Sequence, residues 1–195
     1  MKKVFGKEEP MDNGAGSYHR FLKGDESALE EIVSQYRPGL QNYIYSIVNN
    51  FSVAEDLTEE TFVKLLLKKP RNKGTASFKT WLYTIGRNIA IDWIRKNPQG
   101  REVSIDEIRN IKLEEKQLIQ LYIKDEEKRA VHEILESINP VYKNVLTLFY
   151  FEDFSIEEIS KILKKSKKST SVLLHRAKKS LKAKLEKEDF IYENR

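Results

Sequence analysis

Residues 155–185 read SIEEISKILKKSKKSTSVLLHRAKKSLKAKL and predict two short helices joined by a tight turn. Ser155 followed by Glu158 is a capping-box pattern, which marks a helix start because each side chain can satisfy a free backbone amide of the other. In the second helix apolar residues recur every three or four positions, and the opposite side is basic. A helix-turn-helix needs one packing face and one positive face to lie in the major groove of DNA. The apolar positions are Ile156, Ile159, Ile162 and Leu163, then Leu174, Ala177, Leu181 and Leu185.

The basic residues of the chain gather in two blocks. The whole chain has 35 Lys and Arg against 30 Asp and Glu, a formal net charge of +5. Residues 64–101 hold ten basic residues and one acid, and residues 161–187 hold eleven and one. Two separate basic blocks indicate two contacts with a polyanion, and nucleic acid is the simplest choice. Solvated helix faces are the alternative explanation.

Composition excludes several classes of protein. The chain has no Cys, so disulfides and thiolate catalysis are excluded, and a zinc site would lack its usual sulfur ligands. The three His are scattered without metal-ligand spacing. No secretory signal is present, and no run approaches the ~20 apolar residues of a membrane span. We therefore expect a cytoplasmic protein that is not an enzyme and uses no metal or cofactor.

The helical patterns and the helix-breaking residues between them predict an all-α chain of two small helical domains joined by a flexible linker. Residues 1–17 are expected to be a mobile N-terminal tail, and residues 18–97 a first helical domain. The sequence NPQG at 97–100 breaks the helical pattern. Residues 98–124 are expected to be the linker, and residues 125–195 the second domain, which contains the helix-turn-helix.

The first domain contains a helix with an acidic early part. Ser52 and Glu55 repeat the capping-box pattern and predict a helix over residues 52–67. Acids near a helix N-terminus are favoured by the helix dipole, which is a purely structural explanation. The functional alternative is an acidic docking face for a basic partner. The acids are Asp56, Glu59 and Glu60.

A basic loop follows, with the sequence KKPRNKGTAS at 68–77, and then an aromatic helix over residues 78–96. A basic loop beside such a helix suits the capture of unpaired bases, because lysines attract phosphates while a pocket receives a base removed from the stack. Trp81 could stack on a base or pack in the core, and the sequence leaves both open. The expected core stripe is Phe78, Leu82, Ile85, Ile89 and Trp93.

These blocks, in this order, resemble the extracytoplasmic-function (ECF) sigma factors of bacterial RNA polymerase, in the sigma-70 family. The resemblance covers residues 18–185. It rests on AEDLTEETFVKLL (54–66), FKTWLYTIGRNIAIDWIRK (78–96), LESINPVYKNVLTLFYFEDFSIEEISKIL (135–163) and HRAKKSLKAKL (175–185). It implies a sigma region 2-like domain at 18–97, a region 4-like domain at 125–187, and a factor that directs core polymerase to promoters and helps to melt the −10 element.

The resemblance also implies three sets of contact residues and two kinds of protein partner. The clamp coiled coil of the largest polymerase subunit would be bound by Asp56, Leu57, Glu59, Glu60 and Phe62. The −10 element of promoter DNA would be bound by Lys69, Arg71, Asn72, Lys73, Lys79, Trp81, Tyr83, Arg87 and Asn88. The −35 element would be bound by Lys167, Lys168, Ser169, Ser171, Val172, His175, Arg176 and Lys179. Many relatives are held inactive by an anti-sigma factor, and such a partner is expected here.

The chain departs from the family at the start of the recognition helix. Where the family commonly shows Gly-Thr-Val-Lys-Ser-Arg, residues 168–173 are KSTSVL, so two basic residues are absent. Val172 could meet a thymine methyl group, which is recognised by apolar contact. Alternatively Val172 and Leu173 pack, and the −35 element is recognised through DNA shape and backbone contacts.

Two other functions compete with this one. A stand-alone helix-turn-helix regulator would bind DNA without polymerase, but it leaves the acidic face and the basic loop of the first domain unexplained. A nucleic-acid enzyme is disfavoured because the sequence contains no metal-ligand cluster, nucleophile arrangement or phosphate loop.

Overall fold

The computed structural model describes residues 14–70, 76–98, 134–135 and 137–187. Within these ranges every regular element is a helix, which confirms the predicted all-α fold. The N-terminal group consists of α1 (Ala15–Leu22), α2 (Ser27–Val48), α3 (Phe51–Lys68) and α4 (Phe78–Lys96). The C-terminal group consists of α7 (Pro140–Leu146), the π-helix η2 (Thr147–Phe151), α8 (Ile156–Leu163) and α9 (Lys167–Lys187). Nearly all of the predicted linker lies outside the described residues.

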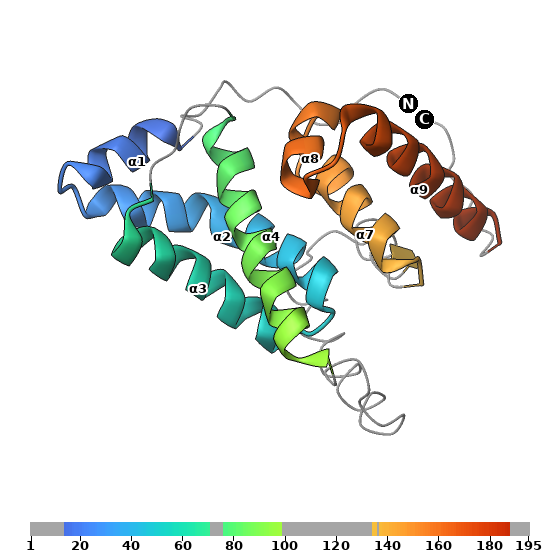
Figure 1. Ribbon diagram of the computed structural model, residues 1–195, viewed down its shortest axis with the longest axis horizontal. Helices are drawn as coiled ribbons and strands as arrows, with labels where there is room; N and C mark the ends of the chain where they lie inside the picture. Colours follow the sequence, from blue (N-terminus) through green and yellow to red (C-terminus); the bar gives the residue numbers. More distant parts are fainter. Residues whose placement is uncertain (1–13, 71–75, 99–133, 136, 188–195) are drawn as a thin grey trace.

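The two groups of helices lie side by side and touch (Figure 1). In the N-terminal group α2 contacts α1, α3 and α4, so it is the central helix of that group. In the C-terminal group α9 packs on both α7 and α8. Contacts between the groups join α4 to α8 and α2 to α7, so the two predicted domains share one continuous core.

The helix-turn-helix is confirmed as the sequence predicts it. The Ser155 hydroxyl accepts a hydrogen bond from the Glu158 amide at 3.3 Å, and Glu158 Oε2 accepts one from the Ser155 amide at 3.0 Å. Helix α8 ends at Leu163, and the left-handed backbone (φ 54°) of the next residue, Lys164, turns the chain. Ser166 Oγ then accepts a hydrogen bond from the Ser169 amide at 3.1 Å, and α9 begins at Lys167.

The predicted start of α3 is wrong. Asn50, with an extended backbone, accepts a hydrogen bond from the Val53 amide at 2.9 Å, so the helix begins at Phe51 and not at a Ser52 cap. Asn49 ends α2 in the left-handed conformation (φ 55°), which places Asn50 directly at the cap. Asn and Ser are comparable caps, so the position of this turn decides between them. Ser52 therefore lies inside the first turn.

The predicted N-terminal tail is also too long by at least three residues. Helix α1 begins at Ala15, and the buried Ser17 donates a hydrogen bond to Glu31 at 2.9 Å. Gly14 precedes the helix with a positive φ of 77°, and an added Cβ there would lie 2.4 Å from a ring carbon of Phe78. A glycine is thus needed where α1 meets α4. The run GAGS at 14–17 looks like a loop in isolation, but the packing of Tyr18 and Phe21 orders it as a helix.

Gly86 sets the distance between α4 and α2. A Cβ at this buried position would lie 2.9 Å from Leu40 Cδ1 and 3.3 Å from Ile44 Cδ1. We expect Gly86→Val to lower the free energy of unfolding by about 1–3 kcal/mol, because overpacking forces neighbouring side chains from their preferred rotamers. Urea denaturation measures this change. The nearly isosteric Thr84→Val in the same helix is the control, and equal midpoints for the two variants would contradict the close contact.

Candidate nucleic-acid and partner surfaces

The outer side of α9 is an exposed, mostly basic face. Thr170, Leu174 and Ala177 are buried, and they turn the opposite side of the helix outward. All residues predicted to contact the −35 element are exposed. They are Lys167, Lys168, Ser169, Ser171, Val172, His175, Arg176 and Lys179. We call this set the α9 face.

Val172 belongs to the exposed surface, with 45% of its area accessible. It lies one helical turn before Arg176 on the same face. The alternative in which Val172 and Leu173 both pack is therefore wrong for Val172, although Leu173 is partly buried against the core. Val172 is placed where an apolar contact with a thymine methyl group could form.

The basic residues of the α9 face differ in whether they form an ion pair within the protein. Lys167 Nζ lies 3.7 Å from Glu157 Oε2, an exposed pair that contributes little to stability. In the described part of the chain, Lys168, Arg176 and Lys179 form no ion pair. Their positive charges are therefore available to an external polyanion.

Helix α3 presents an acidic row to solvent. Asp56, Glu59 and Glu60 are exposed, as the sequence predicts. Glu59 Oε1 lies 3.2 Å from Arg37 Nη2, which also contacts Glu55 at 3.2 Å. Across the described ranges neither Asp56 nor Glu60 forms an ion pair, so no basic side chain there neutralises these two carboxylates.

Two of the residues predicted to bind polymerase lie on the other side of α3. Leu57 and Phe62 are buried in the core of the N-terminal group, so their side chains hold α3 in place and do not line its outer surface. Their apolar character agrees with this role. Their burial corrects the predicted set of contact residues.

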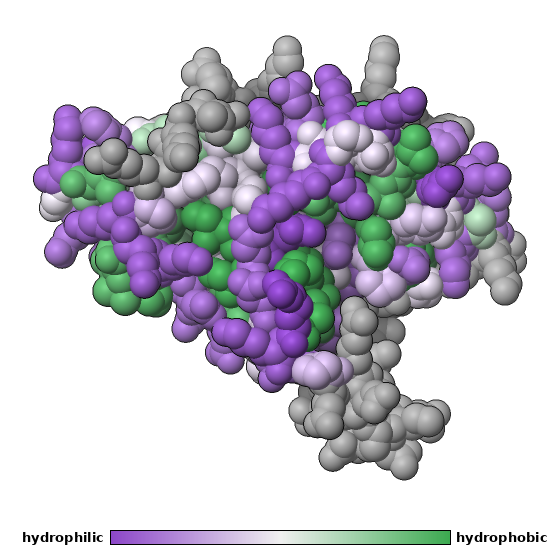
Figure 2. Space-filling view, in the orientation of Figure 1, coloured by the Kyte–Doolittle hydropathy of each residue, from purple (hydrophilic) through white to green (hydrophobic). Residues whose placement is uncertain are grey.

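Exposed apolar residues, which were not predicted from the sequence, continue the acidic row of α3. Val63, Leu66 and Leu67 are exposed, and Leu67 has 73% of its surface accessible. Figure 2 shows hydrophobic surface at this end of α3, among hydrophilic side chains. The three- and four-residue steps from Asp56 would have revealed that these positions share one face. We call Asp56, Glu59, Glu60, Val63, Leu66 and Leu67 the docking face.

The basic loop leaves α3 at Lys69, which is exposed and has a left-handed backbone (φ 40°). The Tyr18 hydroxyl donates a hydrogen bond to the Pro70 carbonyl at 2.7 Å and so holds the start of the loop. Burial raises the pKa of Tyr18 to about 12. The other predicted loop contacts, Arg71, Asn72 and Lys73, lie outside the described residues.

Tyr83, predicted to contact DNA, is buried with 1% of its surface exposed. Its ring stacks on Tyr43 with centroids 5.6 Å apart, and its hydroxyl donates a hydrogen bond to Glu152 of the C-terminal group. Burial first, and then the nearby negative charge of Glu152, raise the pKa of Tyr83 well above its ordinary value. Tyr83 therefore contacts the C-terminal group and is not accessible to DNA in this arrangement.

The other predicted residues of α4 are at least partly accessible. Arg87 and Asn88 are half-buried. Trp81 is also half-buried and packs on Tyr18 and Phe78 at centroid distances of 5.3 and 5.6 Å, which favours its structural role. Lys79 Nζ lies 3.2 Å from Glu152 Oε2 and donates to the Glu152 carbonyl at 2.7 Å.

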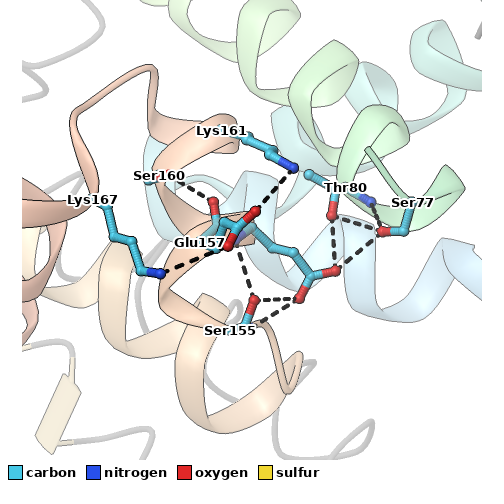
Figure 3. A network of polar contacts seen from close by, with 8 residues as sticks. Ser77, Thr80, Ser155, Glu157, Ser160, Lys161 and Lys167 are labelled. Carbon is cyan, nitrogen blue, oxygen red and sulfur yellow. Dashed lines mark hydrogen bonds and ion pairs between the residues drawn. The ribbon is translucent and has the colours of Figure 1, made fainter. Parts of the chain in front are cut away.

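Glu158 forms a second polar contact between the groups. Its Oε1 accepts hydrogen bonds from Ser77 Oγ and Thr80 Oγ1, both at 3.1 Å. Figure 3 shows Ser77 and Thr80 of α4 facing the start of α8 at Ser155. Burial acts to raise the pKa of Glu158, but the hydrogen bonds from Ser155, Thr80 and Ser77 outweigh it and hold the pKa below its ordinary value.

No three His, Asp or Glu side chains in the described ranges come together in a way that could hold a metal ion. No helix of this part of the chain combines the length and the apolar character needed to cross a membrane.

Comparisons of sequence place both groups of helices in known families. Residues 32–99 match the model of Sigma-70 region 2, and residues 128–181 match that of Sigma-70, region 4. The RNA polymerase sigma factor YlaC of Bacillus subtilis is 32% identical over 164 residues, which cover 82% of this chain and 93% of YlaC. The ECF RNA polymerase sigma factor SigX of the same organism is 26% identical, over 83% of this chain and 85% of SigX.

Comparisons of structure find the same fold. CnrH, solved in complex with the cytosolic domain of CnrY, matches with a TM-score of 0.65 and 18% identity, over 91% of this chain and 100% of CnrH. The sigma factor RpoE from Bartonella quintana, solved with the anti-sigma factor NepR, matches with a TM-score of 0.59 and 20% identity. That match covers 80% of this chain and 96% of RpoE.

Proposed function

The chain belongs to the sigma-70 family of RNA polymerase sigma factors, and we propose that it acts as an ECF-type factor that brings bacterial core polymerase to specific promoters. The observation that carries the proposal is the pairing, on one chain, of two exposed faces with opposite chemistry. The docking face is acidic and apolar, whereas the α9 face is basic and polar. A factor that joins a protein machine to DNA needs both. The polymerase would supply the covalent chemistry, in the cytoplasm.

The docking face is suited to a basic, partly apolar protein surface. Opposite charges would steer the encounter through Asp56 and Glu60, which carry no internal ion pair among the described residues. Burial of Val63, Leu66 and Leu67 would then supply the apolar contribution to binding. We assign this face to the clamp coiled coil of the largest polymerase subunit.

The α9 face would read the −35 element of duplex DNA. A recognition helix enters the major groove with its N-terminal residues against the base edges. Ser171, Val172, His175 and Arg176 would face the bases, while Lys167, Lys168 and Lys179 would contact phosphates. Arginine is the residue that most often donates hydrogen bonds to the major-groove edge of guanine.

The loop between α3 and α4 would act on the −10 element after strand separation. Unstacking a base step costs a few kcal/mol. Stacking on aromatic groups offsets this by roughly 1–3 kcal/mol for each base, and basic residues attract the phosphates. Among the described residues, Lys69 is exposed, and Arg87 and Asn88 are half-buried and could take part in this contact. Arg71, Asn72 and Lys73 are assigned to it from the sequence alone.

A protein inhibitor is the second partner that we propose. CnrH was solved in complex with the cytosolic domain of CnrY, and the sigma factor RpoE was solved in complex with the anti-sigma factor NepR. The exposed docking face and α9 face are the surfaces that such an inhibitor would cover.

Transcription in vitro tests the proposed function. The purified chain is mixed with core polymerase and fragmented genomic DNA of the source organism, and the 5′ ends of the transcripts are sequenced. We expect start sites that share two upstream motifs and that vanish when the chain is omitted. A stand-alone regulator would bind duplex DNA without polymerase and would yield no new start sites, and that result would overturn the proposal.

A further inference from the structure

Val172 lies at the centre of the α9 face. Each residue turns a helix by about 100°, so Val172 points almost directly away from Leu174, which packs in the core with 3% of its surface exposed. Residues three and four positions away are neighbours on a helix surface. Around Val172 these neighbours are all exposed and polar, and they are Lys168, Ser169, His175 and Arg176. The most outward position of the face is therefore apolar and is enclosed by polar and basic side chains.

Hydrogen bonds hold the first turn of α9 in place. Ser166 Oγ accepts a hydrogen bond from the Ser169 amide at 3.1 Å and donates one to Ser169 Oγ at 2.8 Å. The buried Thr170 hydroxyl donates to the Ser166 carbonyl at 3.0 Å. A valine in a helix also keeps one strongly preferred rotamer. Val172 is thus presented on a fixed element in one orientation, as a side chain that selects between bases must be.

The α9 face offers hydrogen-bond donors but no carboxylate and no side-chain amide. In the sequence of α9 the first Asp, Glu, Asn or Gln is Glu186, near the C-terminal end. Asp and Glu accept from the amino group of cytosine, and Asn and Gln bind adenine, whereas Arg and Lys donate to guanine and apolar groups contact the thymine methyl. The composition of the face therefore favours thymine and guanine over adenine and cytosine.

Val172 is suited to thymine in particular. In the major groove thymine presents its methyl group beside the O4 acceptor. Val172 would meet the methyl group, and Lys168 or Arg176, one turn to either side, would donate to O4. A cytosine in the same place would set its amino donor against the valine without an acceptor, and an unsatisfied buried donor is costly.

We infer that Val172 selects a thymine of the −35 element through its methyl group and that Arg176 selects a guanine nearby. The inference rests on the proposed function and names the bases that the α9 face reads. From Val172 to Arg176 the helix rises by about 6 Å, and bases on one strand are about 3.4 Å apart. The thymine and the guanine are therefore expected within about two base pairs of each other.

Replacement of thymine by deoxyuridine tests the contact, because it removes the methyl group and leaves O4 and the base pairing intact. The duplex carries the upstream motif found among the transcripts of the chain with core polymerase, and each thymine of the motif, on either strand, is replaced in turn. Binding is measured for the full chain in complex with core polymerase, as wild type and as Val172→Ser. The matched control is Val141→Ser, because Val141 of α7 is 52% exposed and does not belong to the α9 face.

At one thymine of the motif, deoxyuridine should weaken the binding of the wild type and of the control about fourfold, which corresponds to one buried methyl group. Val172→Ser should bind the two duplexes equally, because a hydroxyl does not replace the apolar contact. For the guanine, 7-deazaguanine removes the N7 acceptor and should weaken wild-type binding about tenfold. The same replacement should leave the affinity of Arg176→Ala unchanged.

Three results would overturn the inference. The first is a motif in which no thymine depends on its methyl group. The second is a methyl effect that persists in Val172→Ser, and the third is an N7 effect that persists in Arg176→Ala. The proposed function fails in a different way, since a chain that starts no transcription with core polymerase yields no upstream motif, and the inference then fails with it.

Discussion

Replacing Asp56 and Glu60 with lysine should lower the affinity for core polymerase by about a hundredfold. Like charges placed face to face across an interface cost several kcal/mol, and each 1.4 kcal/mol changes the dissociation constant tenfold. Both carboxylates are exposed and lack an internal ion pair among the described residues, so no structural contact is lost with them. Fluorescence anisotropy of the labelled chain, titrated with core polymerase at low salt, measures the change.

The control for this pair is a double variant with the same change of charge, Glu26→Lys with Glu30→Lys. Both glutamates are exposed near the start of α2 and do not belong to the docking face. Circular dichroism should show equal helix content in all three proteins. If the α2 control loses as much affinity as the α3 variant, the effect comes from net charge, and the docking assignment is contradicted.

Replacing Arg176 and Lys179 with alanine should weaken binding to −35 duplex DNA and flatten its salt dependence. Each phosphate contact that is lost lowers the slope of log K against log salt by about one, and the loss of a base-reading Arg costs about 1–3 kcal/mol. The measurement uses the chain bound to core polymerase and a duplex with the upstream motif found among its transcripts. Salt titrations of wild type and variant give both quantities.

The matched control removes two lysines from the later part of α9, in Lys182→Ala with Lys184→Ala. Lys182 already pairs with Glu186 within the helix, and both residues lie beyond the predicted contact positions. We expect this control to keep most of the affinity. An unchanged slope for the Arg176 and Lys179 variant would show that the α9 face is merely solvated.

The helix-turn-helix could be predicted from the sequence because its signals are local. The capping box at Ser155, the apolar spacing and the short turn all lie within a few residues of the elements that they define. The start of α3 was missed since Asn50 and Ser52 are both capable of capping a helix. The choice depends on the left-handed turn at Asn49, which the sequence does not display.

The site was predictable only where one helix determines it. The basic side of α9 follows from the apolar stripe of α9 itself, and all residues that the resemblance assigned to the −35 element are exposed. The sequence did not reveal that Tyr83 is buried in this arrangement, because its burial depends on Glu152, which lies 69 residues further along the chain. Leu57 and Phe62 were likewise assigned by resemblance, while their neighbours in space bury them.

The contact between the N-terminal and C-terminal groups could not be predicted from the sequence, because it also depends on residues far apart in the chain. Glu158 has a local role that fully explains it in the sequence, namely the capping box that starts α8. The structure shows that Oε2 serves the cap, while Oε1 reaches Ser77 and Thr80. A single side chain thus carries one predictable and one unpredictable role.

Co-elution of the purified chain with core polymerase tests the central claim most directly. The chain and core enzyme are mixed at low salt without other proteins and separated by size-exclusion chromatography. The account predicts a stoichiometric complex that is lost in the Asp56 and Glu60 variant. A wild-type chain that elutes alone, apart from the polymerase, would contradict it.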